Sequence, residues 1–432
     1  MRIALCPVTA VTCDDDFRVL DDAAIHIENG RISYVGKAQN APPFAPDETL
    51  GGEHLVALPG LVNAHTHAAM TLLRGYADDM SLEAWLQTKI WPFEAHLQAD
   101  DVYWGTLLAC AEMLLGGTTA CADMYHFYRD GVRALTESRM RAVAGGVLLG
   151  FLPEPERRIQ NAIAFAREFS GSANGRISSA LAPHSLYTCD ENQWRAMIAG
   201  AREIGCLLHT HAAESQREIA DVRAAWGDTP IRVLDALGAL QTPLLAAHCV
   251  HVDAEEIEIL ARSGARVAHN PTSNLKLASG FAPVEKFLSR GVATCLGTDG
   301  TASNNDLDMW EEMRLSALLH KATSGDATAV SARQALLMAT RNGAQSLGLD
   351  ETGSLKTGKK ADIVLMDFDK AHLTPRHNVV SHLVYAAKAS DVHSVLVDGE
   401  ILVRNGRLTQ LDLEEIVAQS RQRAARLVVA AR

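Results

Sequence analysis

The sequence lacks several features that would place a protein in a class at once. It has no run of basic residues and a formal net charge of -12, so nucleic acid is disfavoured as a partner. None of its eight cysteines forms a C-x-x-C pair, so we expect reduced, mostly buried thiols rather than a disulfide framework. The longest apolar run, near 143–152, is too short and too rich in glycine to cross a bilayer.

The amino terminus also lacks a long apolar segment, because residues 1–6 lead quickly to three aspartates at 14–16. We therefore expect no signal peptide, no membrane partner and a cytoplasmic location. The chain has 432 residues, of which 47% are hydrophobic and 21% charged, as in ordinary globular proteins. This length predicts two or three domains, or one large α/β barrel with an added module.

Both ends of the chain alternate apolar and polar residues, as β-strands do. Asn29-Gly30 stands between two β-branched runs, which is typical of a hairpin. Residues 361–367 and 392–403 have the same character, the second with Asp398-Gly399 as its turn. We predict a small composite β-sandwich domain, built from residues 1–58 and 354–408, and a C-terminal helix over 409–432. The arginines of that helix, Arg421, Arg423 and Arg426, are expected to form a solvated face.

The middle of the chain, 59–353, alternates short apolar runs with helical segments, the pattern of parallel strands joined by helices. The strand-like runs are 177–183, 206–211, 244–248, 265–270 and 292–297, and helices fit 82–86, 101–115, 191–203 and 283–288. About eight such units would close a (β/α)8 barrel of the TIM type, whose active sites lie at the carboxyl ends of the strands.

Two histidines, His65 and His67, end the first of these apolar runs. Alternate side chains on a strand point the same way, so both imidazoles converge on one point. Neutral imidazole is the commonest metal ligand. A second His-x-His, His209 and His211, ends a later strand. Either of these could be a ligand; His211 lies nearer the mouth, whereas His209 is favoured as a hydrogen-bonded core histidine.

Two further strand ends carry groups that suit the same site. His248 directly ends one apolar strand, and Asp299 ends another with glycines on both sides. A carboxylate at that point can bind a metal and accept a proton; the alternative role for Asp299 is a helix cap, which Ser303 or Asn304 could supply instead. Glu214 closely follows the second His-x-His, where a carboxylate could shuttle protons beside a metal-bound water.

No lysine occurs between Lys89 and Lys276, a stretch that contains every candidate middle strand. Some barrel hydrolases bridge two metals with a carboxylated lysine from a middle strand, and this absence excludes such a binuclear centre. What remains is a single metal with the ligands His65, His67, His211 and Asp299. Nitrogen-rich ligation favours zinc, with iron or manganese as alternatives.

Taken together, these segments resemble the amidohydrolase superfamily, and within it the 5'-methylthioadenosine/S-adenosylhomocysteine deaminase family. The resemblance covers nearly the whole chain and rests on 59–67, 70–75, 91–94, 182–185, 211–214, 248–251, 269–277 and 297–305. It implies hydrolytic deamination of an adenine nucleoside to the inosine analogue and ammonia. It also implies one Zn2+ per subunit, a small-molecule nucleoside as the partner, and, by analogy, a homo-oligomer.

The resemblance implies a role for each matching residue. His65, His67, His211 and Asp299 match the metal ligands, and Glu214 matches the acid/base that moves protons to and from the substrate. His248 matches the histidine that orients or polarises the attacking water, and Asp299 aids the attack.

Four positions match substrate contacts in the family: Glu214 and Asp299, named above, and also Glu94 and His184. Glu94 sits where the family contacts the ribose hydroxyls, and a carboxylate can accept two hydrogen bonds from a vicinal diol. Its alternative is an exposed helix residue. His184, at a strand end, matches a substrate-contacting position, with a hydrogen-bonded core histidine as the alternative.

One departure from the family concerns the 5' end of the substrate. Family members that bind the amino-acid tail of S-adenosylhomocysteine tend to carry arginine on the strand after the second barrel helix, whereas residues 144–149 here contain none. Arg157 or Arg158 could substitute from the next loop, or be solvated. Arginine is the natural clamp for a carboxylate, so the sequence favours methylthioadenosine or adenosine.

Two other functions stay open at this point. A related mononuclear amidohydrolase acting on a free ring (guanine, a pterin or an s-triazine) would have the same metal site. Glu94 discriminates, because a ribose-binding carboxylate has no use on a bare ring. A non-catalytic barrel kept as a scaffold would usually lose ligands, yet all four ligand positions and Glu214 are present.

Overall fold

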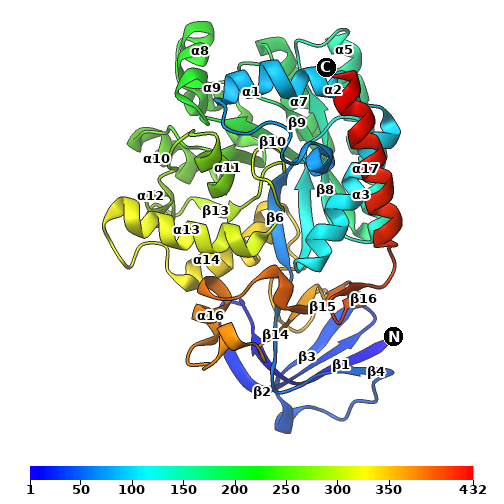
Figure 1. Cartoon of the computed structure of the whole chain (residues 1–432). Coiled ribbons are helices and arrows are strands. Elements are labelled where there is room, and N and C mark those ends of the chain that lie inside the picture. The colour runs from blue at the N-terminus through cyan, green and yellow to red at the C-terminus, as the bar shows by residue number, and fades with distance from the viewer. Residues whose placement is uncertain (432) are drawn as a thin grey trace. The chain divides into compact units, whose positions relative to one another are not determined.

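The computed structural model describes residues 1–431, which divide into two compact units (Figure 1). The first unit comprises Met1–Asn63, Ala111–Ala120 and Asp308–Asp412, and the second Ala64–Cys110, Cys121–Leu307 and the described residues from Leu413 on. The domain limits expected from the sequence stay a prediction.

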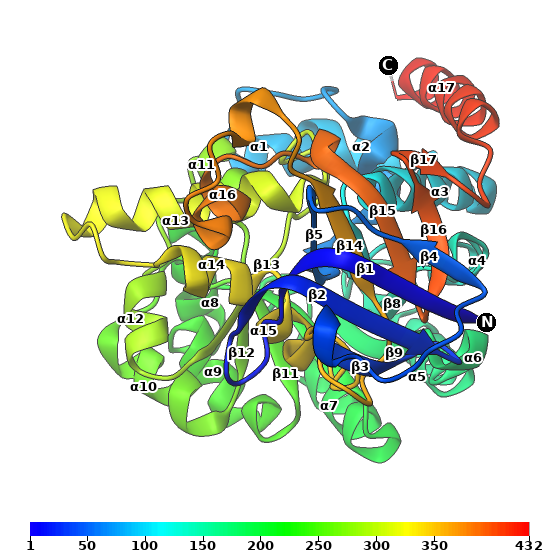
Figure 2. The same cartoon turned by 90° about the horizontal axis from the view of Figure 1, so that it is seen from below.

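Nine strands from the two ends of the chain form one continuous sheet (Figure 2). They are β1 (Arg2–Val11), β2 (Val19–Glu28), β3 (Arg31–Lys37), β4 (Glu48–Leu50), β5 (Leu55–Pro59), β14 (Ile363–Asp367), β15 (Val392–Val397), β16 (Glu400–Arg404) and β17 (Arg407–Leu408). Asn29 and Gly30 join β2 to β3 with φ of 51° and 77°, the left-handed pair that a two-residue type I′ hairpin turn requires. Asp398 and Gly399, with φ of 49° and 70°, do the same between β15 and β16.

One face of this sheet forms a buried apolar cluster. Ile25 and Ile27 on β2, and Ile363 and Leu365 on β14, belong to it and are at most 1% exposed. Alternate residues of a strand point to the same face, so strands from opposite ends of the chain share one core. The β domain predicted from both termini is therefore confirmed, and its strands form one continuous sheet rather than the two layers of a sandwich.

The second sheet is a nearly closed barrel of eight strands, in the order β13-β12-β11-β10-β9-β8-β7-β6. Its strands are β6 (Leu61–Thr66), β7 (Thr118–Asp123), β8 (Arg141–Leu148), β9 (Ile177–Pro183), β10 (Leu207–Ala212), β11 (Leu244–His248), β12 (Arg266–His269) and β13 (Ala293–Leu296). All pairs from β8 to β13 are parallel. Beyond β13, the N–H of Asp299 donates to the carbonyl of His65 on β6 at 2.9 Å. The predicted (β/α)8 fold is confirmed.

Helices connect the barrel strands, and several of them begin with a capping box. The helices are α1 (Leu82–Trp85), α2 (Trp91–Glu94), α3 (Ala99–Leu115), α4 (Tyr128–Ser138), α5 (Pro155–Phe169), α6 (Ser172–Gly175), α7 (Glu191–Ile204), α8 (Gln216–Trp226), α9 (Pro230–Ala236), α10 (Ala254–Ser263), α11 (Pro271–Lys276), α12 (Val284–Ser289), α13 (Met309–Ser324), α14 (Ala332–Met338), α15 (Arg341–Ser346), α16 (Val379–Tyr385) and α17 (Leu413–Ala430). For example, α7 starts with a capping box of Asp190 and Gln193 and ends at Gly205, with φ of 75°. The helix predicted at 82–86 continues as a π-helical turn, Leu86–Ile90, into α2.

One arginine of the C-terminal helix α17, Arg423, lies against α3 rather than in free solution. Arg423 pairs with Asp100, and its guanidinium lies 5.3 Å from the ring centroid of Trp104. Arg426 pairs with Asp101. The expected solvated face is wrong for Arg423, whose side chain is 16% exposed, because the acidic first turn of α3 lies against it.

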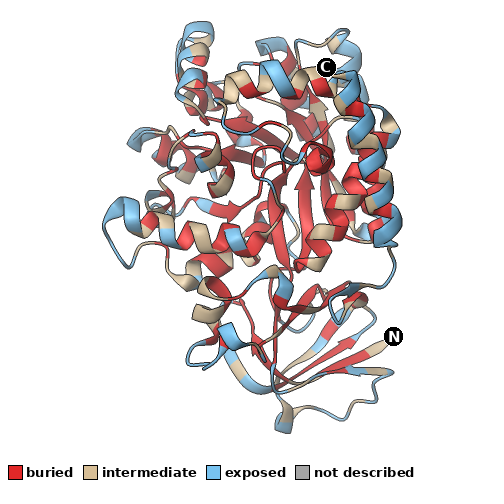
Figure 3. Cartoon of the chain, viewed as in Figure 1, coloured by how far each residue is buried: buried red, intermediate tan, exposed pale blue. Residues whose placement is uncertain are grey.

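Burial follows the two sheets (Figure 3). Strands β7 and β10 are buried along their whole length, as barrel strands are when helices cover one side and packed side chains fill the other. All eight cysteines are free and seven of them are buried, as expected. Within residues 1–431, no helix is both long and apolar enough to span a membrane.

Candidate metal centre and active site

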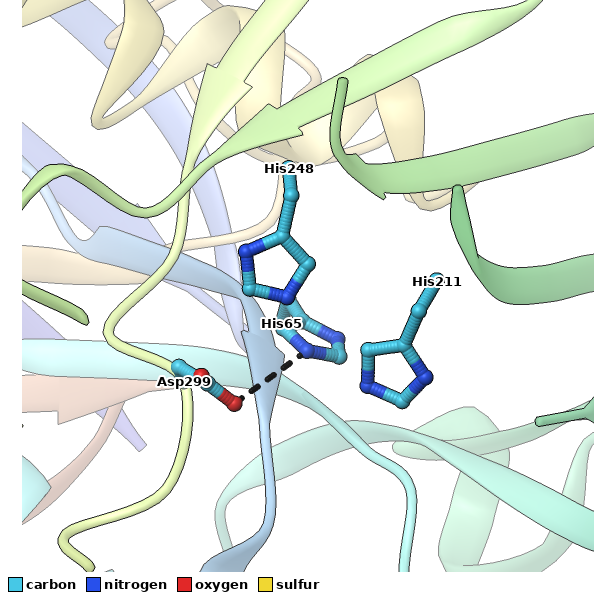
Figure 4. Close-up of side chains that lie close together, drawn as sticks. All are labelled: His65, His211, His248 and Asp299. Atoms are coloured by element: carbon cyan, nitrogen blue, oxygen red, sulfur yellow. Dashed lines mark ion pairs between the residues drawn. The ribbon is translucent and has the colours of Figure 1, made fainter. Parts of the chain in front are cut away.

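Four buried side chains meet at the carboxyl ends of the barrel strands (Figure 4). They are His65 on β6, His211 on β10, His248 at the end of β11, and Asp299 just after β13. Each offers one ligand atom, and these atoms all lie within 4.8 Å of one another. Parallel strands bring these residues together because their carboxyl ends share one edge of the barrel.

His67 lies beside this group. Its Nε2 is 3.1 Å from Oδ1 of Asp299 and 3.3 Å from Nε2 of His211. The Nε2 of His65 is 3.4 Å from the same Asp299 oxygen. Ligands about 2.0–2.1 Å from a tetrahedral zinc are about 3.3–3.4 Å from one another, so these spacings fit a zinc ion. The barrel thus gathers five candidate donors, one more than a tetrahedral site needs.

Oxygen acceptors hold the outer nitrogens of three of these rings. Nδ1 of His67 is 2.5 Å from the carbonyl of Met124, Nδ1 of His211 is 2.8 Å from the carbonyl of His184, and Nδ1 of His248 is 2.8 Å from Oδ1 of Asn274. A carbonyl oxygen only accepts, so each Nδ1 carries the proton and each Nε2 turns a lone pair toward the centre. This is the tautomer that a metal ligand requires.

His65 is held by the other histidine of the second motif. Its Nδ1 lies 2.8 Å from Nε2 of His209. The opposite nitrogen, Nε2 of His65, is buried and makes no hydrogen bond of good geometry. An unpaired buried nitrogen is costly, and a metal ion would satisfy it. His209 therefore contacts His65 on the side away from Asp299. This contact is the one expected if His209 is a hydrogen-bonded core histidine.

The electrostatics of the site also suit a cation. Burial lowers the pKa of His65 to about 4 and moves the pKa of His211 well below its usual value. Burial alone would also lower the pKa of His67, but Asp299 and the carbonyl of Met124 raise it to about 9. Burial would raise the pKa of Asp299, yet the adjacent rings of His65 and His67 hold it well below its usual range. Without metal, the site keeps one proton that a cation would displace.

Asp299 is oriented by two serine hydroxyls. Its Oδ2 accepts from Ser273 at 2.6 Å and from Ser303 at 2.8 Å, which leaves Oδ1 for the histidines. Gly297 precedes it, and a Cβ at that position would lie 2.8 Å from the backbone of His65, so only glycine allows this close approach. The carboxylate points into the site rather than capping a helix.

Glu214 lies at the mouth of the centre and is 6% exposed. Its Oε2 is 3.7 Å from Nε2 of His248, and its Oε1 accepts from Ser279 at 3.5 Å. Burial raises the pKa of Glu214, against the lowering effect of His248. A raised pKa brings a carboxyl closer to neutral pH, where it can both give and take a proton.

These groups open into one cavity with an empty volume of about 640 Å³, part of it open to solvent. Glu94 and His184 both line it, together with Glu214, His248 and Asp299. The Glu94 side chain is 9% exposed, with Oε2 at 3.4 Å from Nε2 of His126, so it is not an exposed helix residue. A cavity of this size, apolar with a few convergent polar groups, is typical of a small-molecule site.

His184 is neutral, and two hydroxyl groups contact its ring nitrogen Nδ1. The hydroxyls of Ser185 and Thr188 lie 3.2 Å from its Nδ1. Burial, with help from the nearby His67 and His126, lowers its pKa to about 3. If the hydroxyls donate to Nδ1, the proton of the ring sits on Nε2, which can donate to a substrate.

The sequence assigns no individual role to Ser273 or Asn274 and suggests Ser303 only as a helix cap. Ser273 and Asn274 orient Asp299 and His248 from α11, and Ser303 lies in the loop after β13. A signal was present, because polar residues directly follow apolar strands at both places. Which of them contact a ligand, and which contact each other, depends on tertiary packing.

Comparisons with known proteins agree with this site. Residues 56–402 match the sequence profile of the Amidohydrolase family. The chain is 46% identical over 428 residues to a 5-methylthioadenosine/S-adenosylhomocysteine deaminase of Pelotomaculum thermopropionicum, covering 99% of each. It is 44% identical over 420 residues to a 5'-deoxyadenosine deaminase of Methanosarcina mazei, covering 97% and 96%.

The fold is also that of a solved enzyme. An adenosine deaminase from Xanthomonas campestris with bound zinc superposes with a TM-score of 0.95 at 37% identity, covering 99% of this chain and 98% of that one. Fold and site together define a metal-dependent hydrolase built on a (β/α)8 barrel. The chain belongs to the amidohydrolase family, and the resemblance stated from the sequence is confirmed.

Proposed function

We propose that this chain is a metal-dependent hydrolase that deaminates an adenine nucleoside to its inosine analogue and ammonia. The substrates we consider are 5'-methylthioadenosine, adenosine and S-adenosylhomocysteine. One observation carries the proposal: a single cavity is lined by the metal-site residues, by the buried carboxyl of Glu214 and by Glu94. The names of the three similar proteins described above, each a deaminase of an adenine nucleoside, support it.

We infer one zinc ion, held by His65, His67, His211 and Asp299. Three distances between these ligand atoms, from 3.1 to 3.4 Å, support this set, and so does the zinc in the Xanthomonas campestris structure. When bound, zinc lowers the pKa of water and polarises the substrate. His248 is then the fifth donor, and its Nε2 faces Glu214 rather than completing the tetrahedron.

Glu214 and Asp299 transfer the protons of this reaction, and His248 orients the water. Water adds to C6 of the purine, the C6–N bond of the amino group breaks, and the products are a C6 carbonyl and ammonia. Glu214 takes a proton from the attacking water and gives it to the ring nitrogen, and Glu214 or Asp299 transfers the second proton of that water to the leaving amine. His248 orients the attacking water through its inward Nε2, since its Nδ1 is fixed on Asn274.

The wall of the cavity favours a substrate with an uncharged 5' end. Among the described residues that line it, none is lysine or arginine, so nothing on this wall clamps the carboxylate of a homocysteine tail. We therefore propose methylthioadenosine or adenosine ahead of S-adenosylhomocysteine. Glu94 accepts from the ribose diol, and His184 donates to the ring.

Other expectations from the sequence remain proposals. We propose a cytoplasmic homo-oligomer without a nucleic-acid partner, supported by the net charge of -12. We also propose the domain limits 1–58 with 354–408, 59–353, and 409–432.

A deamination screen that follows the absorbance change from adenine to hypoxanthine tests the function. We expect turnover of methylthioadenosine and adenosine, weaker turnover of S-adenosylhomocysteine, and none of guanine or an s-triazine. Glu94→Ala should lower kcat/KM on nucleosides by about 10- to 100-fold, as lost hydrogen bonds to a charged group do. Glu83→Ala, on the same segment but outside the cavity lining, is the matched control. Turnover of free rings without nucleoside activity would refute the proposal.

A further inference from the structure

Glu218 is a buried carboxylate that the mechanism above does not use. It lies on the first turn of α8 and is 4% exposed. Its Oε1 accepts the backbone N–H of Ala213 at 2.9 Å, and its Oε2 accepts the backbone N–H of Glu214 at 2.7 Å. Both oxygens therefore bind consecutive peptide groups of the turn that carries the proposed acid/base.

This contact is not an ordinary helix cap. In the capping boxes of α7, α10 and α14, the third helical residue bonds the backbone of the N-cap itself. Glu218 is the third residue of α8, yet it reaches past the N-cap Ser215 to the two residues before it. In two of these boxes the third residue is a glutamine, Gln193 or Gln334, whose amide oxygen accepts the backbone N–H of the N-cap residue. Here the two N–H groups bind two different oxygens of one side chain, an arrangement that a carboxylate provides and that a glutamine amide, with one acceptor oxygen, does not.

The turn that Glu218 holds is strained. Ala213 has φ of 54°, a left-handed conformation that is unfavourable for a residue with a Cβ. On the other side of the turn, the carbonyl of Ala213 accepts from the N–H groups of Val250 and His251, both at 2.9 Å. The backbone that aims Glu214 is thus fixed from two sides, by Glu218 and by the loop after His248.

We propose that Glu218 is a positioning residue that fixes the turn at 213–214 and thereby holds the Glu214 carboxyl in line with the substrate. This inference rests on the function proposed above. Glu218 itself does not contact the reacting atoms. Its effect should therefore fall on kcat and depend on the presence of Glu214.

Glu218→Gln is the first test, because the amide keeps the size but retains a single acceptor oxygen. We expect kcat to fall by about 10- to 100-fold, the usual effect of losing a group that orients an active-site residue, with KM and zinc content unchanged. Glu256→Gln changes the buried glutamate at the same position of α10 and should keep native kcat. If Glu218→Gln does not fold, Glu218→Asp, which keeps both oxygens on a shorter side chain, allows the same measurement.

A double-mutant cycle with Glu214→Gln gives the decisive result. If Glu218 acts through Glu214, its substitution lowers kcat in the native background but adds little in the Glu214→Gln background. Equal losses in both backgrounds, or native kcat in Glu218→Gln, would overturn the inference. A fully active Glu214→Gln would instead overturn the proposed mechanism, so the two failures are distinguishable.

Discussion

The chain carries the His-x-His motif at two strand ends, and the two copies behave differently. On β6, both rings turn Nε2 toward Asp299, His65 at 3.4 Å and His67 at 3.1 Å. On β10, His211 faces the centre, whereas His209 lies behind His65 and bonds its Nδ1 at 2.8 Å.

The difference shows that depth in the barrel decides the role of each histidine. Alternate residues of a strand share a face but lie about 6.6 Å apart along it. Strand β6 ends at Thr66, and the chain turns at His67, with φ of -120° and ψ of 78°, so that the second ring swings to the same level as the first. Strand β10 continues to Ala212, which keeps its two histidines at different levels.

The largest expected effect separates the two histidines of β10. His211→Gln removes a proposed ligand, and kcat/KM should fall by about 10³-fold or more with loss of zinc, since the metal contributes several kcal/mol to catalysis. His209→Gln keeps an oxygen that accepts from His65, so zinc affinity should fall by about 10- to 100-fold at most. Zinc content after dialysis and kcat/KM with added zinc are the measurements. Equal losses of zinc and of kcat/KM in the two variants would contradict the different roles assigned to His211 and His209.

The second effect concerns the proton on His67, which belongs to the His-x-His motif at the end of β6. Asp299 raises the pKa of His67 to about 9, whereas burial keeps His211 neutral. One proton must therefore leave when zinc binds, and apparent affinity should rise about tenfold per pH unit from 7 to 9. In the metal-free protein, the raised pKa of His67 contributes stability that is complete below about pH 6.5 and is lost as pH approaches 9.

Chelator competition across pH, corrected for protonation of the chelator, measures this slope, and thermal unfolding of the metal-free protein measures the stability. A pH-independent zinc affinity would show that His67 does not carry the proton assigned to it.

The smallest effect concerns the backbone beyond each strand. Ala213, after β10, has φ of 54°, whereas Ala68, after β6, begins a short 3-10 helix. Ala213→Gly should stabilise the protein by up to about 1 kcal/mol, because glycine adopts this conformation without a Cβ penalty. Ala68→Gly should instead destabilise it by about 0.5–1 kcal/mol. Urea unfolding compares the two variants, and destabilisation by Ala213→Gly would contradict the assignment of strain.

Much of the fold follows from local sequence. The predicted strands at 177–183 and 244–248 agree with β9 and β11 to the residue, because a polar residue marks the end of each run, His184 just after β9 and His248 as the last residue of β11. The Asn29-Gly30 turn was also predictable from local sequence, since few other residue pairs accept two positive φ values. Strand ends were enough to place Glu214, His248 and Asp299 in one cavity.

What could not be predicted depends on distances between elements. His67 and His248 both follow strands, and only the fold shows that His67 lies 3.1 Å from Asp299 while His248 lies 3.7 Å from Glu214. The pairing of Arg423 with Asp100 joins residues 323 positions apart. Glu218 is the third residue of α8, and its contact with the preceding turn follows only from the position of β10 relative to α8.

X-ray absorption at the zinc edge tests the central claim most directly, that three histidines and one aspartate hold a lone cation. We expect a first shell of nitrogen and oxygen at about 2.0–2.1 Å, dominated by imidazole. A sulfur at about 2.3 Å, or a second metal about 3.5–4 Å away, would contradict the account.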